Sequence, residues 1–111
     1  MAGTFVIEQG KGGKFRFNLK AGNSQVILTS ETYETKAAAE NGIESVRKNA
    51  VDDSKFQRKT AKDDSAYFVL KAANGEKIGK SEMYTSTAGM KRGIKSVATN
   101  APGAKVVDKT S

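Results

Sequence analysis

The sequence contains two copies of one unit, displaced from each other by about 51 residues. Residues 15–50 align with residues 66–101 without a gap, and roughly 16 of the 36 aligned pairs are identical. The identical pairs include apolar residues, a turn asparagine and one glycine in each copy, Gly42 and Gly93. Positions of this kind are set by a fold, so both copies are predicted to adopt the same structure.

The same displacement relates three apolar residues outside that window, namely Phe5, Phe56 and Val107. The segment that precedes each copy therefore resembles the segment that follows the second copy. We expect three equivalent strands to flank the two copies, with strands exchanged between the copies. On this interpretation the copies share one sheet, and neither copy folds alone.

The chain length fits one domain, because 111 residues leave little room for two cores. We therefore treat residues 1–111 as a single domain, with the first repeat at about 4–54 and the second at about 55–108.

Alternation of apolar and polar residues predicts strands, as where Phe15, Phe17 and Leu19 share one face. Helical spacing predicts one helix per repeat, capped by Thr35 and by Ser86. Each helix has a single apolar stripe, so each is expected to cover the sheet from one side. We therefore expect an α+β fold with one mostly antiparallel sheet and both helices on one face of it. The opposite face of the sheet would be open to solvent. The C-terminal strands are expected to be exchanged. The predicted elements are strands at 4–9, 14–20 and 25–29, a helix at 36–48, strands at 55–60, 66–72 and 76–80, a helix at 87–99 and a strand at 105–108.

Gly42 and Gly93 lie in the middle of the two predicted helices. Glycine costs about 1 kcal/mol relative to alanine in a helix interior. The same choice in both repeats predicts that each helix approaches the sheet closely at this point.

The composition excludes several chemistries, because the chain has no cysteine and no histidine. Disulfides, thiolate zinc sites, a cysteine nucleophile and the usual general base near neutral pH are all missing. The acidic pairs Asp52-Asp53 and Asp63-Asp64 lack the spacing of a calcium loop. The glycine-rich segment 10–14 joins two strands and lacks the spacing of a phosphate loop. We therefore expect turns at these places, no metal, no cofactor and no enzymatic activity.

No apolar run approaches the roughly 20 residues that a membrane-spanning helix needs. The first residues also lack the pattern of a secretory signal. The expectation is a cytoplasmic protein without membrane contact.

Four short motifs occur in the second repeat. They are Tyr-Phe-x-Leu-Lys-Ala at 67–72, Asn-Gly-Glu at 74–76, Ile-Gly-x-Ser-Glu-x-Tyr at 78–84 and Gly-Ile-x-Ser-Val at 93–97. Together they resemble the YegP-like family, a group of small bacterial proteins of unknown function. The resemblance implies a βββα-β unit, found as a tandem pair or as a dimer of single units, with one sheet and swapped C-terminal strands. It brings no established activity.

The first repeat departs from this pattern, with Gly22-Asn23-Ser24 at the turn and Leu28 in the place of Gly79. As a tandem member of the family, the chain is predicted to be a monomer that mimics a dimer of single units.

A Ser-Glu-x-Tyr motif occurs where a strand leads into the helix of each repeat. One interpretation makes these residues ligand contacts. The favoured interpretation is structural, with serine and glutamate bonding free backbone groups and tyrosine packing on the core. The motif residues are Ser30, Glu31, Tyr33, Ser81, Glu82 and Tyr84.

The predicted open face of the sheet is basic, in a chain of net charge +7, and Glu8 is the clear opposing charge. Basic side chains around an aromatic ring can hold a nucleic-acid backbone and stack a base, although lysine and arginine are also ordinary on a solvated face. The candidate polyanion-binding residues are Lys14, Arg16, Lys20, Lys55, Lys59, Tyr67, Lys71 and Lys77. A second basic patch, on the second helix, comprises Lys91, Arg92 and Lys95.

Two functions remain open from the sequence. The first is a non-enzymatic binding or interaction module for nucleic acid or another polyanion, acting through the open face. The alternative is a structural or protein-interaction domain without nucleic-acid binding, which would use Val26 and Leu28 as outward apolar residues.

Overall fold

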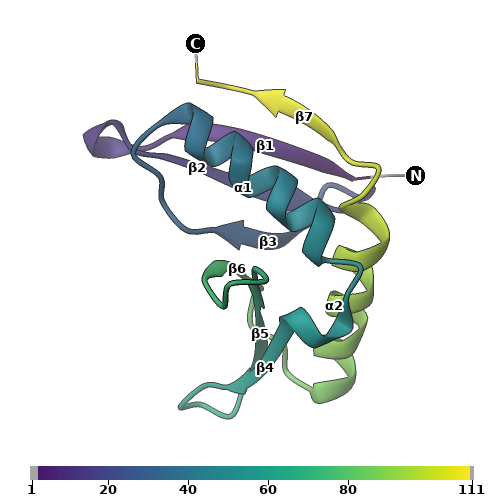
Figure 1. Ribbon diagram of the computed structural model, residues 1–111. Coiled ribbons are helices and arrows are strands. Elements are labelled where there is room, and N and C mark those ends of the chain that lie inside the picture. Colours follow the sequence, from purple (N-terminus) through teal and green to yellow (C-terminus); the bar gives the residue numbers. More distant parts are fainter. Residues whose placement is uncertain (1–2, 111) are drawn as a thin grey trace.

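The computed structural model describes residues 3–110, apart from the side chain of Lys11. These residues form a seven-stranded sheet and two helices (Figure 1). The elements are β1 (Thr4–Gln9), the 3-10 turn η1 (Lys11–Gly13), β2 (Phe15–Lys20), β3 (Val26–Ser30), α1 (Lys36–Asn49), the 3-10 turn η2 (Asp53–Lys55), β4 (Phe56–Thr60), β5 (Ala66–Lys71), β6 (Lys77–Lys80), α2 (Thr87–Asn100) and β7 (Lys105–Asp108).

The strands lie in the order β4-β5-β6-β3-β2-β1-β7. All neighbours are antiparallel except β1 and β7, which are parallel. The strand after each helix lies in the other repeat, because β4 pairs with β5 and β7 pairs with β1. The expected single sheet with exchanged C-terminal strands is therefore confirmed.

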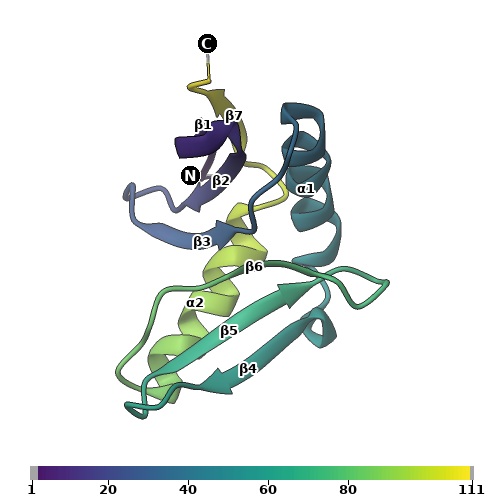
Figure 2. The same ribbon diagram turned by 90° about the vertical axis from the view of Figure 1, so that its left-hand side faces the viewer.

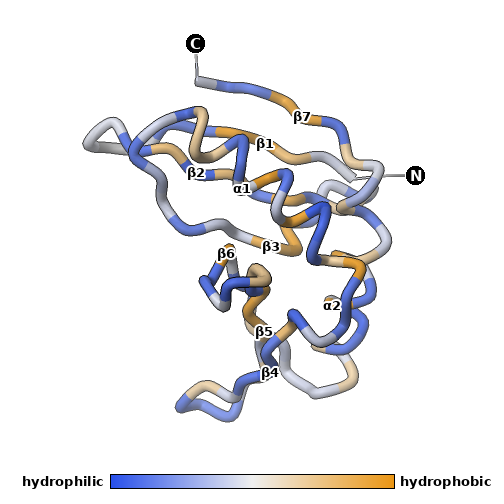
Figure 3. The backbone as a smooth tube through the Cα atoms, in the orientation of Figure 1, coloured by the Kyte–Doolittle hydropathy of each residue, from blue (hydrophilic) through white to orange (hydrophobic). Residues whose placement is uncertain are grey.

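Both helices pack on one face of this twisted sheet, as Figure 2 shows. The core lies between the helices and the sheet and is built from residues such as Phe5, Phe17, Ile43, Phe68 and Val97, all at most 1% exposed. Apolar segments occur along strands of both halves of the sheet, for example in β1, β3 and β5 (Figure 3). Burial of these side chains is the main favourable contribution to the stability of the fold.

The predicted helix caps are confirmed. Thr35 Oγ1 accepts a hydrogen bond of 3.0 Å from the backbone amide of Ala38. Ser86 Oγ accepts one of 3.0 Å from the amide of Gly89. Each cap pairs one of the amides that have no partner within the first turn of a helix, and so defines where the helix begins.

Gly42 and Gly93 allow the close approach that their positions predict. A Cβ atom on Gly42 would lie 2.8 Å from Tyr33 Cζ and 2.9 Å from Phe17 Cε2. On Gly93 it would lie 2.6 Å from Tyr84 Cζ. In each repeat the tyrosine ring therefore occupies the space that a larger helical residue would need.

The prediction that Leu28 points outward is wrong. A β-bulge lies between β2 and β3, because Leu19 pairs with Leu28 whereas Lys20 pairs with Val26. The extra residue, Ile27, breaks the alternation of side chains. Ile27 and Leu28 both face the helices, and Leu28 is fully buried in the core.

The position of Val107 also differs from that of its sequence counterparts. In the parallel pairing of β1 with β7, Phe5 lies opposite Val106 and Val6 lies opposite Val107. Paired residues share a face of the sheet, so Val107 faces away from the helices, unlike Phe5 and Phe56. The 51-residue register therefore identifies the exchanged strand correctly but not the face that its residues occupy.

Candidate functional site

The sheet face opposite the helices, here called the open face, is built from cross-strand pairs that carry positive charge. In its first-repeat half, Arg16 pairs with Glu8 and Lys20 pairs with Thr4. Residues directly opposite each other on neighbouring strands point to the same side, so each pair adds its side chains to one surface.

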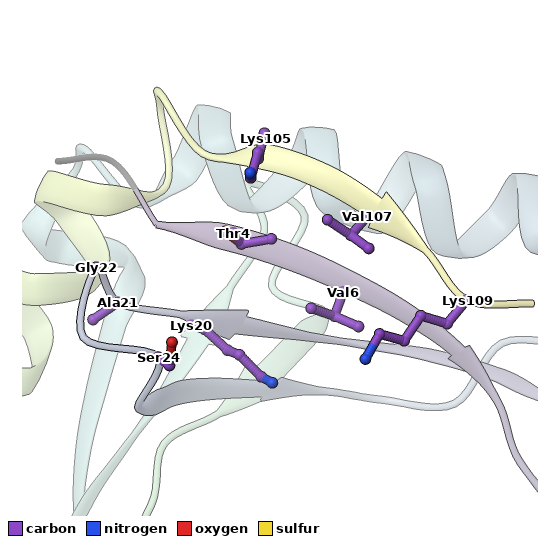
Figure 4. A pocket seen from close by; sticks show the side chains of 9 residues that line it. All are labelled: Thr4, Val6, Lys20, Ala21, Gly22, Ser24, Lys105, Val107 and Lys109. Atoms are coloured by element: carbon purple, nitrogen blue, oxygen red, sulfur yellow. The ribbon is translucent and has the colours of Figure 1, made fainter.

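The edge of that half contains a shallow hollow of about 340 Å³. Val6, which is 6% exposed, and Val107 contribute apolar walls. Lys20 from β2 and Lys109, the residue after β7, lie on either side of Val6, and Lys105 lies further along the same rim (Figure 4). The hollow thus presents three ammonium groups around an apolar floor.

The second-repeat half of the open face also combines apolar residues with lysines. Val69 is buried there at 3% exposure, and its cross-strand neighbour is Lys80. Lysine stems cover apolar surface while the ammonium groups remain in water. The pairs that define this half are Lys59 with Tyr67, Val69 with Lys80 and Lys71 with Lys77.

Six of the residues predicted for polyanion binding lie on the open face and two lie at its margins. Lys14 precedes β2 and forms an ion pair of 2.6 Å with Glu34. Lys55 lies in η2 and forms one of 3.5 Å with Asp52. The six on the face are Arg16, Lys20, Lys59, Tyr67, Lys71 and Lys77.

Three further lysines belong to the open face and were not predicted from the sequence: Lys80, Lys105 and Lys109. Simple alternation from the buried Ile78 would place Lys80 on the helix side of the sheet. A bulge at Ile78 places Lys80 on the open face instead. Lys105 and Lys109 lie two residues on either side of Val107 and share its face of the sheet. The alternating Lys-x-Val-x-Lys pattern of 105–109 was the available signal.

Most cations of the open face are free of ion pairs. Lys77 lies 3.6 Å from Glu31, an exposed and therefore weak contact. Within residues 3–110, the open-face cations that form no ion pair are Arg16, Lys20, Lys59, Lys71, Lys80, Lys105 and Lys109. The face therefore has positive charge that an external anion can neutralise.

The second basic patch does not form one surface. Lys91 and Lys95 lie one helical turn apart and line a hollow between α2 and β4. Arg92 lines a different hollow, together with Gln25 and Tyr84. The structure therefore separates Arg92 from the two lysines with which it was grouped.

The Ser-Glu-x-Tyr motif makes matching contacts in the two repeats. Ser30 Oγ accepts a hydrogen bond of 2.8 Å from the amide of Phe17 and donates one of 2.7 Å to the carbonyl oxygen of Glu31. Ser81 Oγ accepts from the amide of Phe68 at 3.0 Å and donates to the carbonyl oxygen of Glu82 at 2.8 Å. Both hydroxyls are thus engaged within the fold.

The two motif tyrosines stack on core phenylalanines. The rings of Tyr33 and Phe17 lie 6.1 Å apart, and those of Tyr84 and Phe68 lie 6.4 Å apart. Burial raises the pKa of each tyrosine hydroxyl, and the neighbouring Glu31 or Glu82 raises it further. These hydroxyls are therefore neutral near pH 7 and cannot serve as bases there.

The acidic pairs lie in turns. Asp52 Oδ1 accepts from the amide of Ser54 at 3.0 Å, and Asp63 Oδ1 accepts from the amide of Ser65 at 3.0 Å. Within residues 3–110, no three acidic side chains converge in a way that could hold a metal ion. Neither helix of this part of the chain has the length and apolar character needed to cross a membrane.

Comparison with known protein sequences shows close relatives of uncharacterised function. The family model for DUF1508, described as a domain of unknown function, matches twice, at residues 11–56 and 61–108. A UPF0339 protein of Bordetella pertussis is 54% identical over 110 residues, which cover 99% of this chain and 98% of that protein. The UPF0339 protein YegP of Shigella flexneri is 46% identical over 110 residues, which cover 99% of this chain and all of that protein.

Two solved structures have the same fold. The solution NMR structure of yegP from E. coli, a protein of unknown function, superimposes with a TM-score of 0.95 at 45% identity, covering 100% of this chain and 96% of that one. A UPF0339 protein from Shewanella oneidensis superimposes with a TM-score of 0.93 at 46% identity, covering 99% and 93% of the two chains. The predicted resemblance is confirmed, and the chain belongs to the YegP-like DUF1508 family as a tandem-repeat member.

Proposed function

We propose that this chain is a non-enzymatic module that binds nucleic acid or another polyanion through the open face of its sheet. The observation that carries the proposal is the set of cations without ion pairs among the described residues that is spread across the open face, from Lys59 on the edge strand β4 to Lys105 and Lys109 at the opposite edge. Such a row can follow a phosphate backbone, and binding would release the counterions that the backbone holds.

Tyr67 supports single-stranded nucleic acid within that class of ligand. The residue lies on the open face opposite Lys59 and is half-buried, so part of its side chain is exposed. A base can stack on a ring held in this way while neighbouring cations contact the phosphates. A polyanion without bases would bind through the electrostatic contribution alone, without the stacking contribution to affinity.

The absence of enzymatic activity is also part of the proposal. The chain lacks histidine and cysteine, and the hydroxyls of Ser30 and Ser81 already donate and accept hydrogen bonds within the fold. A serine nucleophile needs an adjacent base to activate it.

We further propose that the chain acts as a monomer, because β7 already occupies the edge beside β1. Light scattering at the concentrations used for binding checks this, and a dimer would contradict it.

The test is an anisotropy titration of labelled oligo-dT and oligo-rU at low and at moderate salt. The triple variant Arg16→Glu, Lys59→Glu and Lys71→Glu should abolish binding, because it places acidic groups across the face. The matched control is Lys91→Glu, Arg92→Glu and Lys95→Glu on α2, which makes the same change in net charge away from the open face.

Binding that is salt-sensitive, lost in the first variant and kept in the control supports the proposal. No binding to any DNA or RNA at low salt would contradict nucleic acid as the ligand, and equal loss in both variants would contradict the open face as the site. Titration of inorganic polyphosphate in parallel tells a general polyanion from nucleic acid. The alternative stays a structural or protein-interaction domain without nucleic-acid binding. Of the two apolar residues predicted for its surface, Leu28 cannot contribute because it is buried, whereas Val26 is partly exposed.

A further inference from the structure

A second hollow lies on the opposite side of the sheet, at the edge formed by β4, and has a volume of about 320 Å³. Its floor is apolar, with Phe56 and Ile94 each 5% exposed and Ala98 beside them. Val51, 66% exposed, forms one wall. The volume falls at the lower end of the range for small-molecule sites, so it suits a compact ligand.

The first repeat shows what fills the corresponding space there. Arg47 of α1 takes the place that Ala98 has on α2. The Arg47 guanidinium lies 5.6 Å from the centre of the Phe5 ring, and Phe5 is the counterpart of Phe56. Because the Ala98 side chain ends at Cβ, α2 has no side chain that could cover Phe56 in the same way.

A second difference keeps the hollow open at its side. In the first repeat β7 flanks β1, and Ile7 is fully buried. Ile7 corresponds to Arg58, which is exposed on β4. Within residues 3–110 no strand pairs with the outer edge of β4. A flat apolar group can therefore enter from the edge of the sheet and lie against Phe56.

The rim of the hollow is cationic. Arg58, Lys91 and Lys95 line it, opposed by Asp53. Within the described part of the chain neither of these lysines forms an ion pair. Arg58 Nη2 donates to Asp53 Oδ1 at 2.9 Å, which leaves other N–H groups of the guanidinium available.

The charge pattern is specific to the second repeat. The residues of α1 that correspond to Lys91 and Lys95 are Glu40 and Glu44, so the sign of the charge is reversed. The first repeat combines acidic residues with a covering arginine, whereas the second combines basic residues with a hollow that has an apolar floor. Charge complementarity therefore favours an anion in the second repeat.

We propose that this hollow binds a small aromatic carboxylate, whose ring lies against Phe56 and Ile94 and whose carboxylate contacts Arg58 and the two lysines. The ring takes the place of the guanidinium plane that covers Phe5 in the first repeat. The site is independent of the open face and lies on the other side of the sheet.

Sodium benzoate is the probe, titrated into the full-length ¹⁵N-labelled chain, with sodium chloride added at equal concentration as the blank. Amide shifts should be confined to the hollow, at Val51, Phe56, Lys95 and Ala98, with a dissociation constant in the millimolar range for so small a ligand. Benzamide has the same shape without the charge and should bind several-fold more weakly.

Four variants test the geometry. Ala98→Met fills the hollow without adding charge and should remove benzoate binding. Lys91→Gln and Lys95→Gln should each weaken binding about two- to fivefold, as expected for one exposed charge contact. Asp53→Asn should strengthen it, because it removes the opposing charge. The control is Lys62→Gln in the β4–β5 turn, which should leave affinity unchanged.

Equal binding of benzoate and benzamide, shifts outside the hollow, or retention of binding in Ala98→Met would each overturn the proposal. The glutamine variants carry surface changes only, so they remain informative even if Ala98→Met fails to fold. None of these outcomes bears on the open face, since no probed residue lies on it.

Discussion

Arg47 in α1 donates a hydrogen bond of 2.6 Å from Nη2 to the carbonyl oxygen of Ala104, which lies in the connection that leads from α2 into β7. The two residues belong to different repeats. The contact therefore joins the helix of the first repeat to the exchanged strand of the second, at the place where that strand enters the sheet beside β1.

Replacing Arg47 by Met should loosen the exchanged strand. The change keeps much of the apolar stem but removes a hydrogen bond from a charged donor, so the free energy of unfolding should fall by about 1.5–3 kcal/mol. Urea denaturation measures this loss. Hydrogen exchange should show reduced protection at the Lys109 amide, which donates to the Ile7 carbonyl at 2.9 Å.

The control is Lys48→Met, an exposed neighbour on the same helix, which should change stability by less than about 0.5 kcal/mol. An Arg47→Met protein with wild-type stability and unchanged protection at Lys109 would show that the contact does not hold β7.

Gly42→Ala and Gly93→Ala should destabilise the fold although alanine favours helices. The added Cβ would lie within 2.9 Å of ring carbons of Tyr33 and Phe17 in the first case and 2.6 Å from Tyr84 Cζ in the second. Overpacking of this kind costs about 1–3 kcal/mol, more than the roughly 1 kcal/mol gained in helix propensity. Thermal and urea unfolding measure the net change in the free energy of unfolding.

Gly89→Ala is the matched control on α2, because its nearest neighbour outside the helix backbone is Ser86 Oγ at 3.3 Å. It should be close to neutral. If all three variants behaved alike, close helix–sheet approach would not explain the two glycines.

Acid should weaken the attachment of β7 through Asp108. An ion pair with Lys36 and hydrogen bonds from Thr110 lower the pKa of Asp108 to about 2. The usual value is about 3.9, so the folded state favours the charged carboxylate. The stabilisation is therefore fully present above about pH 4 and is lost as the pH falls towards 2.

A carbon-detected NMR titration of the Asp108 carboxyl measures this pKa directly. Lys36→Met should raise it towards the ordinary range, with part of the depression kept by Thr110. A midpoint near the ordinary value in the unmodified chain would contradict the ion pair.

The exchanged strand should contribute to polyanion binding. Lys105→Glu with Lys109→Glu should weaken oligonucleotide binding and reduce the slope of its salt dependence by about one unit for each phosphate group that the variant no longer binds. Lys62→Glu together with Lys48→Glu makes the same change in charge away from the first-repeat half of the open face and is the control. Titrations at several salt concentrations give both the affinity and the slope of its salt dependence. A wild-type slope in the variant with Lys105→Glu and Lys109→Glu would show that binding is confined to the β4–β6 half of the open face.

Much of the fold could be predicted because its signals are local. Alternation placed β1 at Thr4–Gln9, and helical spacing with a capping residue placed α1 and α2 within a residue of their observed ends. Of the candidate binding residues, Arg16, Lys20, Lys59 and Tyr67 came from simple strand parity, which holds wherever the pairing is regular.

The errors came from the two bulges and from β7. A bulge adds one residue to one strand of a pair, and nothing in the composition of that strand marks its place. Residues beyond the bulge face the opposite side from the one that simple alternation predicts, as Leu28 and Lys80 show. The facing of β7 depends on its register with β1, a partner about 100 residues away in the chain.

Local pattern therefore decides the repeated unit, the ends of its helices and the aromatic residues of its core, since each depends on neighbours within a few turns or a few strand positions. Tertiary packing decides the rest: which face Lys80, Lys105 and Lys109 occupy, and why Arg47 covers Phe5 whereas Phe56, beside Ala98, lies at the floor of a hollow. These depend on register and on contacts between distant segments, and neither is encoded in the sequence of one element alone.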